Sequence, residues 1–381
     1  MSEWKKVSLS EMGIVSRGKS KHRPRNDARL YGGRYPFIQT GDIGAAGLYV
    51  TDYSQTYNEE GLAQSKLWEV NTLCITIAAN IADTALLAFP ACFPDSIMGF
   101  VPYKNVANVK YVKYCFDILK KDCQQISQGT AQDNLSWKKL STIKFPCPPL
   151  EIQNRIASIL SRYDSLIENY QKQIKLLEEA AQRLYKEWFV DLHFPGHENT
   201  KIVDGVPEGW TPSKLGQLAE FKRGKTITKK DAVEGTIPVV AGGLEPAYYC
   251  NRSNTAERVI TVSGSGANAG FTRMYFERVW ASDCSFVDAS TTPFLHFVYC
   301  YLKDNKTTID NMQKGAAQPH IYAKDINSLE ISIPVESILK SFEKNVSKYF
   351  DTISSLQSQI RLLTEARDRL LPKLMSGEIA V

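Results

Sequence analysis

The sequence predicts an α+β protein in which two mixed α/β globular domains are separated by two long helices that form an antiparallel coiled coil, arranged as an internal pseudo-twofold repeat. Two observations predict this class: the chain repeats its own sequence, and each copy ends in a long segment of heptad-spaced apolar residues. A length of 381 residues, with 43% hydrophobic and 23% charged residues, suits a globular protein of two domains and excludes disordered and collagen-like classes.

The repeat is visible near both ends of each half. A Trp, a Leu five residues later and then an Arg-Gly-Lys triplet open the two halves at Trp4 and at Trp210, an offset of 206 residues. Further on, Gly129-Thr130-Ala131-Gln132 matches Gly315-Ala316-Ala317-Gln318 at an offset of 186, and this register continues without a gap for over 50 residues. The two offsets differ by about 20 residues, so the ends of the halves match while their middles differ in length.

Long helices are predicted over 152–188 and 338–374, which contain no Gly and a single Pro, Pro372. A helix of about 36 residues is about 54 Å long, and an apolar stripe of that length is normally buried, so we expect the two helices to pack on each other. Because one globular segment precedes each helix, antiparallel packing puts those segments at opposite ends of a rod. Arg367 is the one polar residue in the stripe. The residues predicted to form the seam are Ile156, Tyr163, Tyr170, Leu177, Leu184, Phe342, Tyr349, Leu356, Leu363 and Leu370.

The globular segments carry many short apolar runs punctuated by Gly and Pro, which indicates short strands. The segment between the halves is rich in Pro, Gly and polar residues, as linkers are. The predicted organisation is a first globular domain at 1–149, a spacer helix at 150–190, a linker at 191–206, a second globular domain at 207–333, a second spacer helix at 334–376 and a tail at 377–381.

The formal net charge of +5 says little by itself, because the clustering of charge matters more than its total. Six basic residues lie between Arg17 and Arg29 against one acid, Asp27, and five lie between Lys222 and Lys230 before any acid appears. A solvated charged face is the plain interpretation of one such run, but recurrence at the equivalent place in both halves favours contacts to nucleic-acid phosphates. The candidate contacts in these two runs are Arg17, Lys19, Ser20, Lys21, Arg23, Arg25, Lys222, Arg223, Lys225, Thr226, Lys229 and Lys230.

Polar side chains outside the basic runs are candidates for reading base edges, because short hydroxyl, amide and imidazole groups supply the donors and acceptors that base edges match. Ser263 and its neighbours up to Gly270 resemble a dinucleotide loop, but their glycine spacing and the lack of a following helix favour a turn between strands. The candidate base contacts are Gln39, Asn80, Gln132, Ser263, Ser265, Asn268, Gln318 and His320.

Two alternatives to a DNA-binding function remain open at this point. Gly13 to Ser20 satisfies the P-loop pattern G-x-x-x-x-G-K-[ST], but no apolar strand precedes it, and the second half has Ala219 in place of the first glycine. The other alternative is a coiled-coil adaptor whose globular segments serve other proteins. His193 and His197 lack partners at ligand spacing, so no metal site is expected, and no catalytic residue is assigned.

The eight cysteines form no C-x-x-C pair and most lie in apolar surroundings, which indicates reduced thiols in a cytoplasmic protein. No apolar stretch follows the first charged residues, so no signal peptide is expected. The most apolar window, 72–93, contains Asp83 and Pro90, so no membrane segment is expected either.

The residues around the first helix carry a family resemblance. Pro148-Pro149-Leu150-Glu151-Ile152-Gln153 leads the helix, Leu184-Tyr185-Lys186-Glu187-Trp188-Phe189 closes it, and Gly205-Val206-Pro207-Glu208-Gly209-Trp210 opens the second half. Together with the duplication and the total length, these motifs make the chain similar to the specificity (S, HsdS) subunit of a Type I restriction–modification system. The resemblance covers the whole chain.

The resemblance implies a DNA specificity subunit that is not itself an enzyme. Each globular domain would be a target recognition domain reading one half of a bipartite sequence in double-stranded DNA, with the paired helices setting the spacing. The helices would also dock two methyltransferase (M) subunits, and the assembly would recruit restriction (R) subunits. The resemblance implies no cofactor on this chain, with S-adenosylmethionine, ATP and Mg²⁺ on the partner subunits.

One departure from the family pattern concerns the second helix. It begins Pro334-Val335-Glu336-Ser337-Ile338-Leu339, where the first helix has Leu-Glu-x-Gln. The resemblance therefore does not imply that the contacts of the two helix starts are identical. The chain contains no N/D-P-P-[YF] methyltransferase motif, in agreement with a non-catalytic role.

Overall fold

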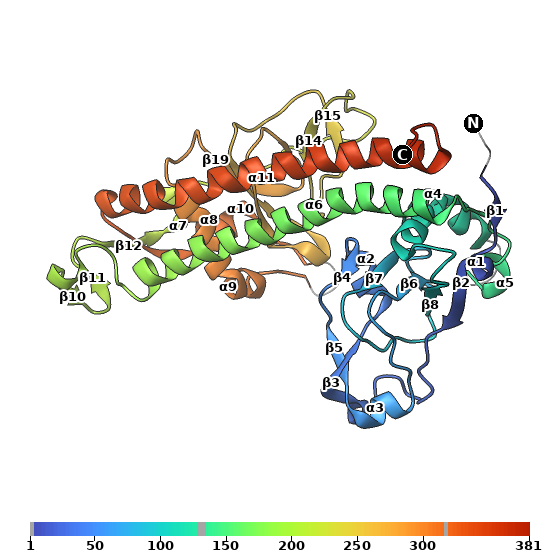
Figure 1. Cartoon of the computed structure of the whole chain (residues 1–381). Helices are drawn as coiled ribbons and strands as arrows, with labels where there is room; N and C mark the ends of the chain where they lie inside the picture. Colours follow the sequence, from blue (N-terminus) through green and yellow to red (C-terminus); the bar gives the residue numbers. More distant parts are fainter. Residues whose placement is uncertain (1–3, 128–134, 316–318) are drawn as a thin grey trace. The chain divides into compact units, whose positions relative to one another are not determined.

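The computed structural model describes residues 4–127, 135–315 and 319–381 (Figure 1). The chain divides into two units, one formed by Met1–Tyr170 with Gln359–Val381 and the other by Gln171–Ser358. Each unit holds one globular lobe and part of each of two long helices, α6 (Leu150–Tyr185) and α11 (Glu336–Ser376). We call residues 4–149 the first lobe and residues 207–333 the second lobe.

The first lobe is built on a five-stranded sheet with the order β2-β8-β6-β7-β4. All its neighbouring strands are antiparallel except β4 and β7, and every residue of β6 and β7 is buried. The strands and helices of this lobe are β1 (Lys6–Val7), α1 (Leu9–Met12), β2 (Gly13–Arg17), β3 (Tyr31–Phe37), α2 (Thr40–Ala45), β4 (Tyr49–Val50), β5 (Gln55–Tyr57), α3 (Glu59–Ala63), β6 (Leu73–Thr76), β7 (Thr84–Leu87), β8 (Ile97–Pro102), α4 (Val109–Ser127), α5 (Trp137–Leu140) and β9 (Phe145–Pro146), with a 3-10 turn at Ala28–Leu30.

The second lobe is built on a four-stranded sheet with the order β13-β19-β16-β17, beside a three-stranded sheet with the order β15-β14-β18. Its elements are β12 (Thr211–Lys214), α7 (Leu215–Leu218), β13 (Lys222–Arg223), β14 (Ile237–Val240), β15 (Tyr248–Cys250), β16 (Val259–Ser263), β17 (Thr272–Tyr275), β18 (Trp280–Ala281), β19 (Cys284–Asp288), α8 (Leu295–Asp304), α9 (Lys306–Asn311), α10 (Ala323–Asn327) and β20 (Glu330–Ile333). The hairpin β10 (Ile202–Val203) and β11 (Val206–Pro207) precedes it.

The two lobes share one topology. The order β2-β8-β6-β7 of the first corresponds to β13-β19-β16-β17 of the second, and the pair β1–β9 corresponds to β12–β20. The buried faces of these sheets pack with the apolar faces of α4 and α8, respectively. The first lobe adds α2 and β4 between β3 and β5, where the second connects β14 to β15 directly. The structure confirms the predicted repeat and places part of the length difference in this insertion.

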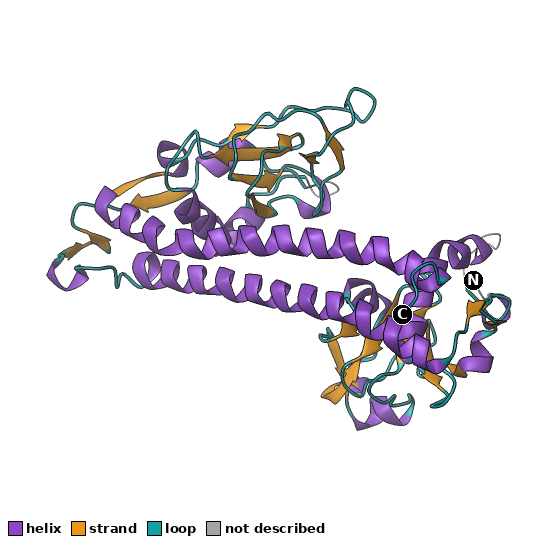
Figure 2. Ribbon diagram, turned by 45° about the horizontal axis from the view of Figure 1, so that its top comes forward, coloured by secondary structure: helices purple, strands orange, loops and turns teal. Residues whose placement is uncertain are grey.

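The long helices pack on each other in both units (Figures 1 and 2). In the first unit, Ile156 and Leu160 near the start of α6 share a core with Leu374 near the end of α11. In the second unit, Ala181 near the end of α6 shares a core with Phe342 near the start of α11. The two helices therefore run antiparallel, which confirms the predicted fold class. Each of the ten residues predicted for the seam is buried or half-buried.

A buried glutamine fastens the start of α6 to the first lobe. The Gln153 side chain is fully buried; its Oε1 accepts from the backbone N–H of Asn108 at 3.0 Å, and its Nε2 donates to the carbonyls of Val106 at 3.0 Å and Pro148 at 2.9 Å. The matching position of α11 is Leu339, which is buried in an apolar core. The departure from the family pattern at the second helix thus replaces a hydrogen-bonded contact by an apolar one.

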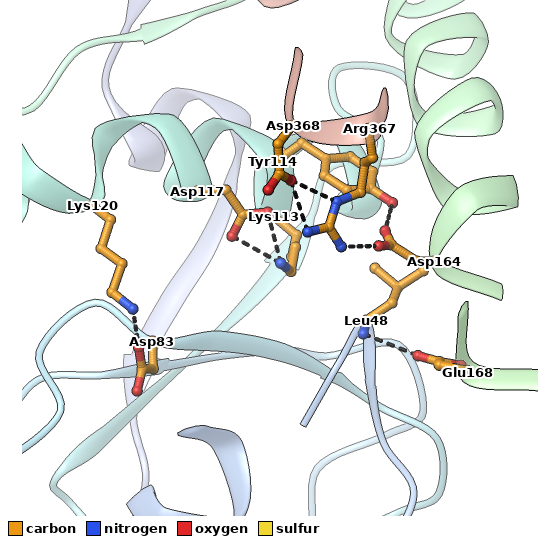
Figure 3. Close-up of polar contacts among 10 residues, drawn as sticks. All are labelled: Leu48, Asp83, Lys113, Tyr114, Asp117, Lys120, Asp164, Glu168, Arg367 and Asp368. Carbon is orange, nitrogen blue, oxygen red and sulfur yellow. Dashed lines mark hydrogen bonds and ion pairs between the residues drawn. The ribbon is translucent and has the colours of Figure 1, made fainter. Parts of the chain in front are cut away.

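The polar residue in the seam is neutralised at the junction of α4, α6 and α11 (Figure 3). Arg367 of α11 donates to Asp164 of α6 at 2.6 Å and to Asp368 at 2.8 Å, and Tyr114 of α4 donates to the second oxygen of Asp164. Burial acts against the charged form of Arg367, but the hydrogen bonds to Asp164 and Asp368 outweigh it and raise its pKa. Burial foremost, and then the charge of Asp164, raise the pKa of Tyr114, so it remains a donor.

Two further contacts hold the same lobe in place (Figure 3). Glu168 of α6 accepts a hydrogen bond at 3.0 Å from the backbone N–H of Leu48, which lies in the α2–β4 insertion. Lys120 of α4 donates to Asp83, in the turn between β6 and β7. The Glu168 contact joins the first lobe to α6, whereas the Lys120–Asp83 pair is only partly buried and connects two elements within the lobe.

The corresponding junction in the second unit is aromatic. The repeat offset of 186 places Phe350 where Asp164 stands and Ala181 where Arg367 stands, and both are buried. His296 of α8 stacks on Phe350 with ring centroids 4.5 Å apart, and its Nδ1 lies 2.6 Å from a carboxylate oxygen of Glu343 in α11. The two lobes are therefore held on their helices by different chemistry.

The described residues include no membrane-spanning helix. All eight cysteines are unpaired thiols, seven of them buried and Cys147 half-buried. Burial raises the pKa of these thiols where it is complete, as at Cys74 and Cys300, so they remain protonated.

Candidate nucleic-acid interface

The Arg-Gly-Lys triplet of the first lobe forms a loop whose backbone is anchored at several points. It follows directly from β2, in which Arg17 pairs with Met98 of β8. The N–H of Gly18 donates to the carbonyl of Ile97 at 2.8 Å, and the N–H of Lys19 to that of Phe93 at 3.0 Å. The Ser65 hydroxyl then donates to the Lys19 carbonyl at 2.7 Å. The loop is therefore tied to the strand ends on both sides.

The loop continues onto a second anchor, the side chain of Gln64. Its Oε1 accepts from the backbone N–H of Lys21 at 2.6 Å and of His22 at 3.0 Å. Two successive N–H groups on one acceptor fix the direction of the chain at this point. The side chains of residues 17–21 are thereby presented from a fixed backbone.

The triplet of the second lobe is anchored in the same way. Arg223 of β13 pairs with Ser285 of β19, the N–H of Gly224 donates to the carbonyl of Cys284 at 2.8 Å, and the N–H of Lys225 to that of Ala281 at 2.9 Å. The Lys225 carbonyl again receives a side-chain donor, here the indole N–H of Trp280 at 2.6 Å. Two residues further on, the Tyr248 hydroxyl donates to the Ile227 carbonyl at 2.6 Å.

The glycine in each triplet is required by a close backbone approach. A Cβ on Gly18 would lie 2.3 Å from the carbonyl oxygen of Pro94, and a Cβ on Gly224 would lie 2.3 Å from that of Ser282. Real Cβ atoms do not approach a carbonyl so closely, and a backbone atom cannot move aside as a flexible side chain does. The packing thus explains why the triplet keeps Gly in both halves.

The basic side chains of the two loops point outward without acidic partners. Arg17 and Lys21 are exposed and Lys19 is half-buried, and in the second lobe Lys222, Arg223, Lys225, Thr226, Lys229 and Lys230 are exposed. Within the described ranges, no ion pair involves any of these lysines and arginines. Cationic side chains on a rigid backbone and free of carboxylates are suited to binding phosphate oxygens.

The later part of the first basic run is engaged within the protein. Arg25 and, at 3.8 Å, Arg23 pair with Asp95, and Arg23 also donates to the carbonyl of Ser20 at 2.7 Å. Arg29 forms an ion pair with Asp27 at 2.7 Å, and its hydrogen bonds hold the pKa of Asp27 well below its usual range. Charge count alone therefore overstates the number of arginines available to a ligand.

Two of three further sequence candidates in the first lobe, Ser20 and Gln39, have side chains engaged in local contacts. Ser20 is buried, with its hydroxyl 3.5 Å from that of Tyr57. Gln39 caps α2 and donates to Gln55 at 2.7 Å. The third, Asn80, is exposed in the turn between β6 and β7, where its backbone carbonyl accepts from the Thr76 hydroxyl. Gln132 and Gln318 lie outside the described residues.

The remaining candidates of the second lobe come together at one end of strands β16 and β17. Ser263 and Asn268 both donate to the carbonyl of Gly242, at 3.1 and 3.4 Å. Ser265 forms a bridge with His320, whose ring stacks on that of Tyr322. The segment between β16 and β17 is thus a turn between strands, as its glycine spacing predicts, and it contains a 3-10 turn at Gly266–Asn268.

The P-loop alternative finds no support. Gly13–Arg17 is strand β2, in which Gly13 packs against β8, and no helix follows in residues 18–27. No group of three or more His, Cys, Asp or Glu side chains in the described part of the chain is arranged to hold a metal ion. His193 instead contacts Glu187 at 3.0 Å, with its ring 5.4 Å from that of His197.

Sequence reasoning missed the residues that fix the loops, namely Gln64, Ser65, Tyr248 and Trp280. They lie between 21 and 55 residues from the loop atoms that they bind, so no local pattern connects them. The anchoring groups also differ between the lobes, with a serine hydroxyl doing in one what an indole N–H does in the other. Comparing the sequences of the two halves therefore could not identify these anchoring residues.

Comparison with known proteins gives consistent matches over the whole chain. A family model described as the Type I restriction modification DNA specificity domain matches residues 1–179 and again 207–365. The chain is 33% identical to the Type I restriction enzyme MjaVIII specificity subunit of Methanocaldococcus jannaschii, over 100% of this chain and 93% of the relative. It is 27% identical to the MjaIX specificity subunit of the same organism, over 100% and 94%.

A solved structure supports the fold. The S subunit of a Type-I restriction-modification system from M. genitalium superposes with a TM-score of 0.62 at 17% sequence identity, covering 97% of this chain and 96% of that chain.

The close approach at the triplet glycines predicts that Gly18→Ala and Gly224→Ala each destabilise the protein, by about 1 to 3 kcal/mol, because the added methyl overlaps a carbonyl oxygen that has no room to move. Denaturant unfolding of the full chain measures the effect. Gly41→Ala is the matched control, since nothing lies within 4 Å of its Cβ position. Equal stability of the Gly18→Ala, Gly224→Ala and Gly41→Ala variants would contradict the packing argument.

Proposed function

We propose that this chain, which belongs to the Type I restriction modification DNA specificity family, reads a split DNA target in which each lobe binds one half and the paired helices set the distance between the halves. As a specificity subunit it is the non-catalytic, sequence-reading component of its system. The P-loop and adaptor alternatives explain neither the family match nor the duplicated basic loops.

One observation carries the proposal: both lobes present the same backbone-anchored Arg-Gly-Lys loop with unpaired basic side chains. A single basic loop on one lobe is compatible with many anionic partners. Two equivalent loops on two equivalent lobes, each lobe attached to the same pair of antiparallel helices, suit two equivalent binding events on one long anionic polymer. Double-stranded DNA is such a polymer.

The length of the helices sets the scale of the target. A helix of 36 residues, the length of α6, is about 54 Å long at about 1.5 Å per residue. That distance corresponds to about 16 base pairs at about 3.4 Å each. A spacer of this length is enough to put two half-sites about a turn of duplex apart, with bases between them that neither lobe reads.

The remaining roles follow from membership of the family. We propose that the helices and their flanks dock two methyltransferase subunits and that restriction subunits join the assembly. S-adenosylmethionine, ATP and Mg²⁺ then act on those partners, and this chain binds none of them. We also propose that the two recognition domains, the two spacer helices, the linker and the tail meet at residues 149, 190, 206, 333 and 376. Free, buried thiols support a cytoplasmic location.

The half-site model predicts that the DNA of a strain carrying the active system is methylated at a bipartite motif, two short specified sequences separated by a fixed number of unspecified bases. Two independently anchored lobes give this pattern because neither of them reaches the central bases. Methylome sequencing measures it, with a strain deleted for the gene as the control. A continuous palindromic motif would contradict the model.

The unpaired basic side chains predict a strong dependence of DNA affinity on salt. Replacing Arg17, Lys19 and Lys21 by Gln should lower the slope of log affinity against log salt by roughly 2 to 3, since each lost phosphate contact removes about 0.9. Fluorescence anisotropy with a labelled duplex, using the complex of the full chain with its methyltransferase subunits, measures the slope.

The matched control is the double variant Asp27→Asn/Arg29→Gln, which removes an internal ion pair from the same segment without changing the net charge. Its slope should equal that of the unmodified protein. A triple variant whose slope also stays unchanged would show that these three side chains do not contact phosphates.

A further inference from the structure

The turn after β16 in the second lobe and the turn after β6 in the first share one scaffold. The N–H of Gly264 donates to the carbonyl of Asp283 at 3.2 Å, and the N–H of Ile77 to that of Ser96 at 3.0 Å. The Gly264 carbonyl accepts from Ile321 at 3.1 Å, as the Ile77 carbonyl accepts from Leu135 at 3.0 Å. Two residues after each of these positions the backbone is left-handed, with φ of 76° at Gly266 and 60° at Ala79.

The side chains on this shared scaffold differ between the lobes. Superposing these hydrogen bonds makes Ser265 of the second lobe equivalent to Ala78 of the first, and Asp283 equivalent to Ser96. The second lobe therefore carries a hydroxyl and a carboxylate where the first carries a methyl group and a hydroxyl. A backbone kept in both halves, with side chains changed at the same two points, is the arrangement expected of positions that discriminate between two different ligands on one framework.

Asp283 is oriented but not neutralised. The Ser265 hydroxyl donates to its Oδ2, while no described residue donates to its Oδ1 and no described Lys, Arg or His forms an ion pair with it. The carboxylate is half-buried. Because only one of its oxygens accepts a hydrogen bond within the described residues, the other oxygen can accept one from a donor outside the protein.

The position of Asp283 ties it to the basic loop. It stands between β18 and β19, and its neighbours Ser282 and Cys284 are the residues against which Gly224 packs and hydrogen-bonds. Asn268 and Ser263 hold the adjacent strand connection through the carbonyl of Gly242. A ligand whose phosphates lie on Lys222, Arg223 and Lys225 would therefore bring its other groups near this carboxylate.

We propose that Asp283, oriented by Ser265, is a specificity-determining residue of the second lobe and accepts a hydrogen bond from the exocyclic amino group of a base, cytosine N4 in the first place. Among base edges in the major groove, cytosine and adenine present amino donors, and Asp is a known acceptor for cytosine N4. Guanine O6 and thymine O4 are acceptors and would be repelled by the carboxylate, so the same group selects for one class of base and against the other. The assignment rests on the proposed DNA-reading function.

The experiment is selection of bound duplexes from a library randomised in both half-sites, using the complex of the full chain with its methyltransferase subunits. Asp283→Asn should lower the preference for cytosine by about 10-fold or more at one position of one half-site, because the neutral amide can also donate and no longer repels guanine O6 or thymine O4. Ser265→Ala should weaken the same preference by less. The other half-site and the salt dependence should be unchanged, because no phosphate contact is lost.

A gain-of-function variant keeps the proposal testable if Asp283→Asn lowers the amount of folded protein. Ala78→Ser/Ser96→Asp builds the same pair on the first lobe and should create a preference for an amino-bearing base in the other half-site. Glu257→Gln is the matched control, since this exposed carboxylate precedes β16 and so lies at the opposite end of that strand.

The outcomes separate this inference from the function on which it rests. If the unmodified complex selects a bipartite motif and Asp283→Asn selects the same one with equal affinity, the assignment of Asp283 is overturned and the function stands. A uniform loss of affinity at all positions also overturns it, because it would indicate a structural role. If the unmodified complex selects no bipartite motif, the proposed function itself fails.

Discussion

The antiparallel packing of α6 on α11 is the constraint on which the rest of this structure depends. The presence of two similar lobes in one chain does not by itself determine how those lobes are oriented to bind a ligand. Because each helix continues from the lobe before it, and because the start of one packs with the end of the other, each lobe is built into a unit that contains parts of both helices. Burial of the seam leucines, isoleucines and aromatic residues stabilises this arrangement. In the function we propose, the paired helices can set the distance between half-sites because they cannot separate without exposing that seam.

The lobes combine a common backbone framework with different side chains. Both hold an Arg-Gly-Lys loop by the N–H groups of the Gly and the Lys, and both satisfy the Lys carbonyl with a side-chain donor. The attachments to the helices differ, with Asp164, Arg367 and Tyr114 in the first unit against Phe350 and Ala181 in the second. A buried ion pair of this kind specifies how the packed elements are oriented more than it adds to the net free energy of folding. In the function we propose, the shared framework would give both lobes a common mode of phosphate contact, and the variable side chains would allow two different base sequences.

The sequence was sufficient for the parts of the fold that periodicity and duplication encode. Heptad spacing predicted both long helices, because it is visible within one segment of sequence. Two constant offsets predicted the repeat, because they come from comparing one half of the sequence with the other. The candidate interface was harder. Counting charges pointed to the basic runs but could not show that Arg23 and Arg25 are engaged by Asp95, since that contact joins residues about 70 positions apart and depends on tertiary structure. Asp283 carried no sequence signal, because the role we propose for it depends on a hydroxyl 18 residues away and on a loop far earlier in the chain.

The most direct measurement of the central claim is the gap between half-sites after the helix pair has been lengthened. Insertion of one heptad after Lys172 in α6 and one after Ser358 in α11, positions related by the repeat offset, adds about 10 Å to both helices at once, or about 3 base pairs. Methylome sequencing of a strain carrying this variant should return the same two half-site sequences with about 3 more unspecified bases between them. An unchanged gap, with both half-sites still recognised, would contradict the account.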